Sequence, residues 1–265
     1  MMLKTFFKPG FILFFLLTVS ALTPVNATNS DVAKESRWAE QVIDGLLDGD
    51  EYWLIDDIGH EFLSILTEGD KSSGRAVVLV HGIGVHPNWP DVIYPLRAGL
   101  LEQGITTLSL QMPILANDAD EREYGLLFPE VPGRFEAALD YLDDEGYKKV
   151  TIVGHSMGAS MATYYLSQSD ASAVDSLVII GMDAGNAFFN LLEALAKVRV
   201  PVLDLYGSED LEPVLNSVEQ RALSGKKQSG RQYLQIRVDG ANHFFQGHED
   251  ALVRQVTEWL EAQQN

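Results

Sequence analysis

A serine between two glycines carries the clearest chemistry in this 265-residue chain. The segment GHSMG at 154–158 has the pattern G-x-S-x-G, and it directly follows the apolar run KVTIV at 149–153. Between a strand and a helix, this pattern predicts a sharp, strained turn that exposes the serine hydroxyl. Gly154 and Gly158 would leave room there for neighbouring backbone. We therefore expect Ser156 to be a nucleophile, with an oxyanion forming near the start of the next helix.

A serine hydroxyl is a weak nucleophile and needs an adjacent base. Among the six histidines, His243 directly follows the last apolar run, where it could reach back over the edge of a sheet. His248 is expected to be a surface residue at the start of the closing helix. His155 adjoins the serine, but the strained turn should point it away. His243 is therefore the preferred base.

The base needs an acid that fixes its tautomer and stabilises its charged form. The segment after the apolar run 200–206 supplies Asp210, which we prefer because it is the farther acid of the turn, and Glu209 as the fallback. Asp204 lies inside the same run and is expected to be a hydrogen-bonded strand residue. Asp183, after the preceding run, is a second alternative.

An oxyanion hole needs two backbone N–H groups, one of them from the residue after the serine. That residue is Met157. The second group would come from the loop HGIGVH at 81–86, which follows the apolar run AVVLV at 76–80, and Ile83 is the expected donor. His81 is interpreted as a structural hydrogen-bonding residue of this loop.

The elements that must position these residues alternate along the chain. The runs expected to form strands span 52–55, 61–66, 76–80, 106–111, 149–153, 176–180, 200–206 and 232–238. The segments expected to form helices span 35–47, 92–103, 131–145, 157–168, 188–197 and 249–263. The polar, acidic segment 114–131 has no clear period and is expected to be a loop. This alternation predicts an α/β fold with a mostly parallel sheet and ligands at the carboxyl ends of its strands.

The first 27 residues resemble a secretory signal. Lys4 and Lys8 precede an apolar stretch at 11–22, and Val-x-Ala closes the segment at 25–27. The alternative is an uncleaved anchor, although the apolar stretch is short for a membrane span. We expect residues 1–27 to be a signal peptide and residues 28–265 to be a single domain, exported to the periplasm or the medium.

The composition excludes several kinds of chemistry and partner. The chain has 38 acidic and 19 basic residues, a formal charge of −19, so nucleic acid is not an expected partner. It has no cysteine, which excludes disulfides, thiolate chemistry and cysteine-based metal sites. A metal site of His243, His248 and Glu249 would have no third strong ligand nearby, so no metal is expected. The acidic closing segment argues against membrane-surface binding after signal cleavage.

The order of these motifs resembles the α/β-hydrolase superfamily over about residues 50–265. The resemblance rests on HGIG at 81–84, GHSMG at 154–158, YGSED at 206–210 and GANHFF at 240–245. Three further segments resemble an uncharacterised group of exported bacterial hydrolase-like proteins: HPNWP at 86–90, PLR at 95–97 and LSLQMP at 108–113.

The resemblance implies the α/β-hydrolase fold, with a mostly parallel eight-stranded sheet flanked by helices. It implies acyl transfer to water without a metal or organic cofactor. Ser156 would be the nucleophile, His243 the base and then the acid, and Asp210 the orienting residue. The backbone N–H groups of Ile83 and Met157 would bind the oxyanion.

The resemblance is incomplete in the cap region. Only residues 182–199 occupy the place where many members carry a long cap, so a minimal cap and a shallow site are expected. The apolar residues here either rim the site or pack in the core: Phe188, Phe189, Leu191 and Leu192. A second group, from 114–131, could lean over the site: Tyr124, Leu126, Leu127 and Phe128. A shallow site favours small acyl groups, and the acidic charge favours neutral or cationic small-molecule esters.

These observations favour a carboxylic-ester hydrolase of the cell envelope. A thioesterase, amidase or peptidase would share the same constellation. A different class is a non-catalytic envelope binding or assembly protein on the same fold. A haloperoxidase-like or lyase reaction is a minor third interpretation.

Overall fold

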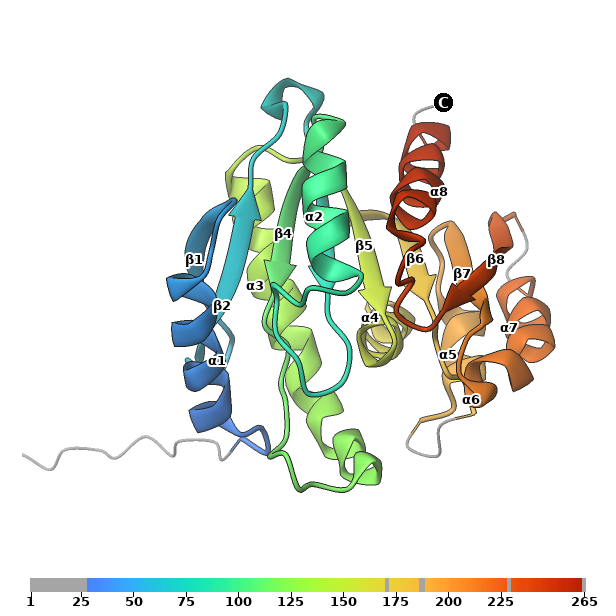
Figure 1. Ribbon diagram of the computed structural model, residues 1–265, viewed down its shortest axis with the longest axis horizontal. Helices are drawn as coiled ribbons and strands as arrows, with labels where there is room; N and C mark the ends of the chain where they lie inside the picture. The colour runs from blue at the N-terminus through green and yellow to red at the C-terminus, as the bar shows by residue number, and fades with distance from the viewer. Residues whose placement is uncertain (1–27, 170–171, 186–188, 228–229, 264–265) are drawn as a thin grey trace, which may run out of the picture.

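The computed structural model describes residues 28–169, 172–185, 189–227 and 230–263. The predicted signal peptide, residues 1–27, lies outside the described residues. One eight-stranded sheet forms the centre of the molecule, in the order β1-β2-β4-β3-β5-β6-β7-β8 (Figure 1). The strands are β1 (Asp50–Ile55), β2 (Glu61–Thr67), β3 (Arg75–Val80), β4 (Thr106–Leu110), β5 (Lys149–His155), β6 (Val174–Ile180), β7 (Val202–Glu209) and β8 (Tyr233–Asn242).

The sheet is antiparallel at one end and parallel over the rest. Strand β1 pairs antiparallel with β2, and β2 pairs antiparallel with β4. All further pairs, from β4 to β8, are parallel. The eight expected runs correspond to these eight strands, and the mostly parallel sheet is confirmed.

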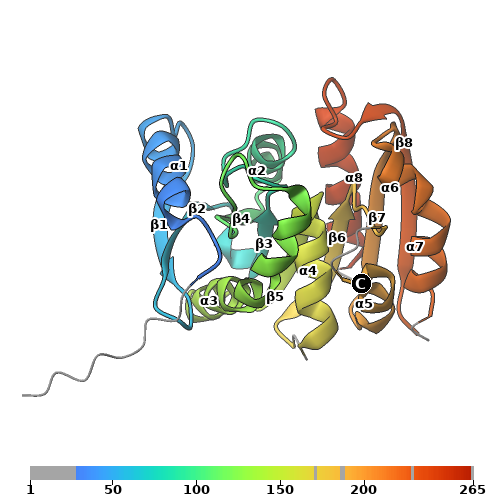
Figure 2. The same cartoon turned by 90° about the horizontal axis from the view of Figure 1, so that it is seen from below.

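Helices cover both faces of the sheet. Figure 2 shows α1, α2 and α8 on one face and α3, α4 and α5 on the other. The α-helices are α1 (Val32–Asp44), α2 (Ile93–Glu102), α3 (Val131–Asp144), α4 (Met157–Gln168), α5 (Leu191–Lys197), α6 (Glu212–Asn216), α7 (Val218–Gly225) and α8 (Glu249–Ala262). Two 3-10 helices, η1 (Lys71–Ser73) and η2 (Glu121–Glu130), complete the described elements.

Strand β3 shows why the central strands are apolar on every residue. Val77 and Leu79 belong to the core layer under α2 and α8, whereas Val78 and Val80 belong to the layer under α3 and α4. A strand buried on both faces needs a continuous run of apolar side chains, as in AVVLV. Each such side chain contributes about 1.5–3 kcal/mol when it is fully buried.

Two parts of the chain differ from the sequence-based expectation. The segment 114–131 is not all loop, because η2 occupies its second half. A 3-10 helix repeats every three residues, so it gives no 3.6-residue pattern. Helices α6 and α7 were not expected. They are five and eight residues long, and too short for a clear apolar period.

The register of the parallel strands brings their carboxyl ends to one edge of the sheet. Val80 lies beside Gly154, and Ile180 lies between His155 and Leu205. The segments that follow β3, β5, β6, β7 and β8 therefore meet at that edge. The candidate residues predicted from the sequence come from these segments.

Candidate active site

Ser156 lies on a strained turn between β5 and α4. Its φ of 54° and ψ of −118° are unusual for a residue with a side chain. Such a backbone conformation costs about 1–3 kcal/mol. The N–H group of Ser156 donates to the carbonyl of Ile180 at 2.8 Å, which fixes the turn against the neighbouring strand. The expected strained turn is therefore present, and the side chain of Ser156 is partly exposed.

The two glycines around the serine are required by close backbone contacts. A Cβ atom on Gly154 would lie 2.6 Å from the carbonyl oxygen of Gly158. A Cβ atom on Gly158 would lie 2.5 Å from the carbonyl oxygen of Val80. Neither position tolerates a side chain without moving backbone, so the tight packing of α4 on β3 and β5 depends on both glycines.

His243 and Asp210 form a buried pair at the same edge of the sheet. The Nδ1 atom of His243 lies 2.6 Å from Oδ1 of Asp210. Oδ1 also accepts from the N–H of Leu211 at 2.8 Å, and Oδ2 accepts from the N–H of Gly207 at 3.3 Å. Because a carboxylate can only accept here, the Nδ1 atom of His243 carries the proton. This leaves Nε2 as the basic atom of the neutral ring.

The pKa of Asp210 is held below its usual value. Burial alone would raise the pKa, but the hydrogen bond from His243, its charge, and the two backbone N–H groups lower it further than burial raises it. Asp210 is therefore a carboxylate at neutral pH. Its negative charge can stabilise a protonated His243.

Gly181 connects the histidine to the serine turn. An added Cβ atom on Gly181 would lie 3.0 Å from both Nδ1 and Cε1 of His243 and 3.4 Å from Oδ2 of Asp210. Gly181 follows Ile180, whose carbonyl receives the N–H of Ser156. The serine turn and the imidazole thus both lie against the end of β6. Among the described residues, the hydroxyl of Ser156 makes no hydrogen bond. Such bonds often align only when substrate is bound.

The loop 81–86 passes close to the serine. A Cβ atom on Gly82 would lie 3.4 Å from the Cβ atom of Ser156. Ile83 follows directly and is partly exposed. Met157 opens α4, so its N–H has no acceptor within the helix. Both expected oxyanion donors are therefore in segments that border Ser156.

His81 fixes this loop as a neutral hydrogen-bonding residue. Its Nδ1–H donates to the carbonyl of Gly82 at 2.8 Å, and its Nε2 accepts from the N–H of Met112 at 2.9 Å. Burial lowers the pKa of His81 to about 4, so the ring is uncharged at neutral pH. The structural interpretation of His81 agrees with this geometry.

His155 contacts His243 through a hydrogen bond that was not predicted from the sequence. Its ring is buried, and its Nε2–H donates to the backbone carbonyl of His243 at 3.0 Å. Burial lowers the pKa of His155 to about 3, which keeps the ring neutral. The bond spans 88 residues of chain, so only its place beside the serine could have drawn attention to it.

The alternative acids lie elsewhere. Asp204 is buried and receives Nε–H of Arg221 at 2.8 Å and the hydroxyl of Tyr233 at 2.6 Å, as expected for a hydrogen-bonded strand residue. Glu209 is exposed at the end of β7. Asp183 accepts from the N–H of the nearby Gly185 at 2.7 Å. Within the described residues, only Asp210 among the acids considered makes a hydrogen bond to His243.

The apolar residues of the expected rim pack mainly in the core. The ring of Phe189 lies 4.5 Å from that of Phe128 and 4.7 Å from that of Tyr164, measured between centroids. Leu191 is buried, and Leu192 packs partly buried against the same core. Phe188 lies outside the described residues. In η2, Tyr124, Leu127 and Phe128 are buried and Leu126 is exposed.

His248 is the residue before α8, near its expected place. In the described part of the chain, no cluster of three or more histidine and acidic side chains is placed to hold a metal ion. The described helices also include none with the length and apolar character needed to cross a bilayer.

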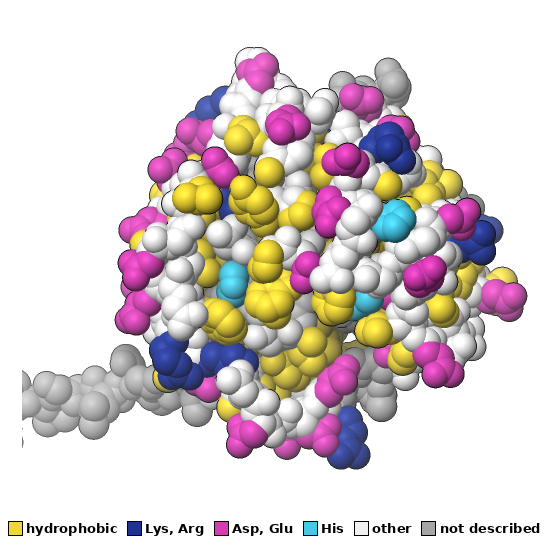
Figure 3. All heavy atoms as spheres, viewed as in Figure 1, with side chains coloured by type: hydrophobic (Ala, Val, Ile, Leu, Met, Phe, Trp, Pro, Cys, Tyr) yellow, Lys and Arg dark blue, Asp and Glu magenta, His cyan; other side chains and the backbone are white. Residues whose placement is uncertain are grey.

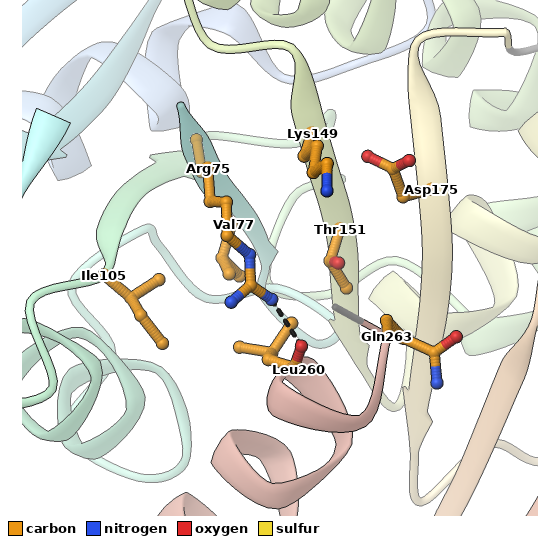
Figure 4. A pocket seen from close by; sticks show the side chains of 9 residues that line it. Arg75, Val77, Ile105, Lys149, Thr151, Asp175, Leu260 and Gln263 are labelled. Carbon is orange, nitrogen blue, oxygen red and sulfur yellow. Dashed lines mark hydrogen bonds between the residues drawn. The ribbon is translucent and has the colours of Figure 1, made fainter. Parts of the chain in front are cut away.

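A small cavity lies at the opposite edge of the sheet, at the amino ends of β3 and β5 (Figure 4). Arg75 points across it and donates to the carbonyl of Leu260 at 2.5 Å. Lys149 and Asp175 line it side by side, so with Arg75 the lining holds two basic side chains and one acidic side chain. Because β5 is seven residues long, about 20 Å separate this cavity from Ser156.

Known structures share this architecture. A dienelactone hydrolase from Anabaena variabilis is 21% identical with a TM-score of 0.67, over 81% of this chain and 98% of that chain. Est1E from Butyrivibrio proteoclasticus is 16% identical with a TM-score of 0.64, over 82% of this chain and 99% of that chain. An esterase from Pyrococcus furiosus is 16% identical with a TM-score of 0.67, over 83% of this chain and 93% of that chain. No curated protein matches the sequence.

The sheet order and these likenesses show that the chain has the α/β-hydrolase fold, as the sequence motifs implied. Within that fold it belongs to the family described as protein of unknown function (DUF3530), whose model matches residues 18–132 and 128–262. The fold is shared by many activities, so the function has to be argued from the site.

Proposed function

We propose that this chain is an exported serine hydrolase that cleaves carboxylic esters by acyl transfer to water. One observation carries the proposal. A serine in a strained turn and a buried histidine–aspartate pair with a 2.6 Å hydrogen bond share one edge of the sheet. Backbone strain and buried charges lower the stability of the folded state, and both cluster at functional sites.

In the first half of the reaction, the Oγ atom of Ser156 attacks the ester carbonyl carbon. His243 Nε2 takes the hydroxyl proton, and the carbonyl π electrons move to the oxygen. The N–H groups of Ile83 and Met157 would donate to that oxyanion, and losing one such donor costs about 10²–10³ in kcat. His243 then gives its proton to the alcohol oxygen, the bond from carbon to that oxygen breaks, and an acyl-enzyme remains.

Water completes the cycle. His243 Nε2 removes a proton from water, and the hydroxide attacks the acyl carbon. The second tetrahedral intermediate collapses when His243 returns the proton to Ser156 Oγ, which releases the acid. Asp210 keeps the proton on Nδ1 of His243 throughout and stabilises the charged ring.

Similar structures include a dienelactone hydrolase and esterases, which supports carboxylic esters as the first substrates to test. The minimal cap is consistent with small acyl groups. We propose export from the basic, apolar and Val-x-Ala order of residues 1–27. Amino-terminal sequencing of secreted protein tests this, and the expected first residue is Thr28.

Hydrolysis of p-nitrophenyl esters of increasing acyl length tests the activity, with Ser156→Ala as the control. We expect turnover of short-chain esters that is lost in the variant. Thioesters and amides with matched acyl groups define the bond type. No turnover of any of these by well-folded protein would favour the envelope binding or assembly protein instead.

A further inference from the structure

Helix α1 packs against the loop that supplies the expected oxyanion donor Ile83. Lys34 Nζ donates to the carbonyl of Leu115 at 2.8 Å and lies 3.8 Å from the position of a Cβ atom on Gly84. The ring of Trp38 packs against that of His86, with 4.7 Å between centroids and an angle of 50° between the ring planes. The first two turns of α1 therefore pack against the loop 81–86.

A cavity of about 170 Å³ opens beside these turns. It is lined by Lys34, Arg37, Trp38, Gln41 and Asn117. Two of the five residues are cations and none is acidic, although the whole chain has twice as many acidic as basic residues. Figure 3 shows Lys and Arg side chains gathered near the start of the described chain, on a face where acidic side chains are widely spread.

The donors around this cavity are not fully used. An ammonium group has three donors, and the carbonyl of Leu115 takes one from Lys34. Among the described residues, Arg37 makes no ion pair and the buried indole N–H of Trp38 has no acceptor. Asp31, the acid whose charge acts on Lys34, already accepts from the backbone N–H of Lys34 as the cap of α1.

The charges beside the cavity would be stabilised by an anion. Burial lowers the pKa of Lys34, Asp31 opposes this shift, and the neighbouring charge of Arg37 adds to it. Two cations side by side with one of them partly desolvated are unfavourable unless a negative group joins them. A guanidinium and an ammonium together match the two oxygens of a carboxylate.

The cavity is within reach of the serine. Gly82 approaches Ser156, Gly84 approaches Lys34, and the two glycines are two residues apart. Two residues of chain span about 7 Å, so Lys34 Nζ lies at most on the order of 14 Å from the Cβ atom of Ser156. A flexible substrate of moderate length can bridge that distance.

We propose that this cavity binds a carboxylate carried by the substrate, so that the preferred substrates are esters with an anionic group remote from the scissile bond. The inference rests on the proposed ester hydrolysis and names its substrate class. It revises the expectation from net charge that neutral or cationic esters are preferred. Charges beyond about 8 Å are screened at physiological salt, whereas Lys34 and Arg37 would contact the bound group directly.

Half-esters of dicarboxylic acids test the preference. The p-nitrophenyl half-esters of a series of chain lengths are compared with the same compounds capped as neutral methyl esters. We expect kcat/KM for the half-ester to exceed that for the capped ester about tenfold at one length, as for a charge-assisted contact. Arg37→Gln should reduce the ratio to near one. Arg254→Gln, an exposed cation on α8, should leave it unchanged.

A ratio at or below one at every length in the native protein would overturn the proposed site and leave the hydrolase intact. An equal fall in Arg254→Gln would also overturn it, because the effect would then be general charge. If no ester is turned over, binding of the monomethyl esters of the same diacids to Ser156→Ala decides the site separately. Binding that weakens about tenfold with Arg37→Gln supports it, and no binding at any length rejects it.

Discussion

Two buried carboxylates in this molecule each form a hydrogen bond with a histidine, but of these two pairs only one lies near Ser156, the proposed nucleophile. Asp210 holds His243 at 2.6 Å, and Glu35 holds His60 at 3.1 Å. Glu35 also receives Nη2–H of Arg134 at 3.0 Å, so a fully buried guanidinium neutralises it. The first pair lies at the carboxyl edge of the sheet. The second joins α1 to α3 and to the turn between β1 and β2.

The two pairs differ in the number of positively charged partners that each carboxylate has. Within the described residues, Asp210 has no second cationic partner, so its charge acts on His243. The charge of Glu35 is shared between His60 and Arg134, and Asp56 lies a further 3.7 Å from Nε of Arg134. A histidine–carboxylate pair therefore indicates catalysis only when its position and its charge balance agree.

The largest effect is expected from Asp210→Asn. The amide would donate to Nδ1 of His243 and hold the ring in the wrong tautomer. We expect kcat/KM for ester hydrolysis to fall about 10⁴-fold. Steady-state kinetics on a short-chain ester measure this. A fall of less than tenfold would place the orienting acid elsewhere.

In the second pair, Glu35→Gln should change stability instead. Removing one member of a buried ion pair leaves the charge of Arg134 poorly compensated. We expect the free energy of unfolding to fall by about 3 kcal/mol, since Asp56 remains nearby. Urea denaturation at pH 7 measures the change, and the exposed Glu40→Gln on the same helix is the matched control. Equal stability of the two variants would show that the buried ion pair between Glu35 and Arg134 does not stabilise the fold.

The stabilisation from the ion pair between Glu35 and Arg134 should decrease at acidic pH. Burial alone would raise the pKa of Glu35, but hydrogen bonds and charges from His60 and Arg134 lower it overall. A carboxyl group whose pKa is lowered by folding stabilises the folded state at any pH above its pKa in the unfolded chain, which is about 4.3. This stabilisation is lost as the pH falls through the pKa of the folded state. Glu35→Gln should therefore lose less stability than the native protein below pH 4.

A third effect comes from the buried histidines around the serine. The pKa of His155 is lowered to about 3 and that of His81 to about 4, mainly by burial. The pKa of a histidine in the unfolded chain is about 6.5. When the pH falls below this pKa, the unfolded chain binds protons that the buried rings of the folded protein do not, so the free energy of unfolding decreases. Each histidine should contribute a loss of about 2 kcal/mol between pH 7 and pH 5.

Comparison of the native protein with His155→Gln isolates this effect, and His81→Gln gives a second variant. Lower pH also relieves repulsion among the acidic residues, but equally in each protein. We expect the loss between pH 7 and pH 5 to be smaller by about 2 kcal/mol in either variant. Identical losses in the native protein and both variants would contradict neutral, buried rings.

The smallest effect is expected from Glu209→Gln. This exposed residue adjoins Asp210 in sequence and was the fallback acid. We expect kcat/KM to change less than about twofold, because surface charges contribute little. A loss close to that of Asp210→Asn would reverse the choice between the two acids.

The strands and the candidate site could largely be predicted from the sequence. Apolar runs of five to seven residues mark the central strands, because both faces are buried. The carboxyl ends of parallel strands meet at one edge, so Ser156, Asp210 and His243 could be brought together from their positions just after these runs. The strained turn is predicted by the glycines around the serine.

Other features depend on contacts between distant segments. Arg221 pairs with Asp204 across 17 residues, and His155 bonds the carbonyl of His243 across 88. No local pattern contains such pairs. The ion pair between Glu35 and Arg134 joins residues 99 apart in the sequence. In the sequence alone, each of the two resembles an ordinary surface charge on a helix. Burial, which decides their role, is a property of the folded chain.

Labelling with a fluorophosphonate tests the activated serine most directly, because the probe reacts with an activated hydroxyl without requiring a known substrate. We predict covalent labelling of the native protein at Ser156, strongly reduced labelling of Asp210→Asn and none of Ser156→Ala. Absence of labelling in folded native protein, or equal labelling of Ser156→Ala, would contradict a catalytic serine at this turn.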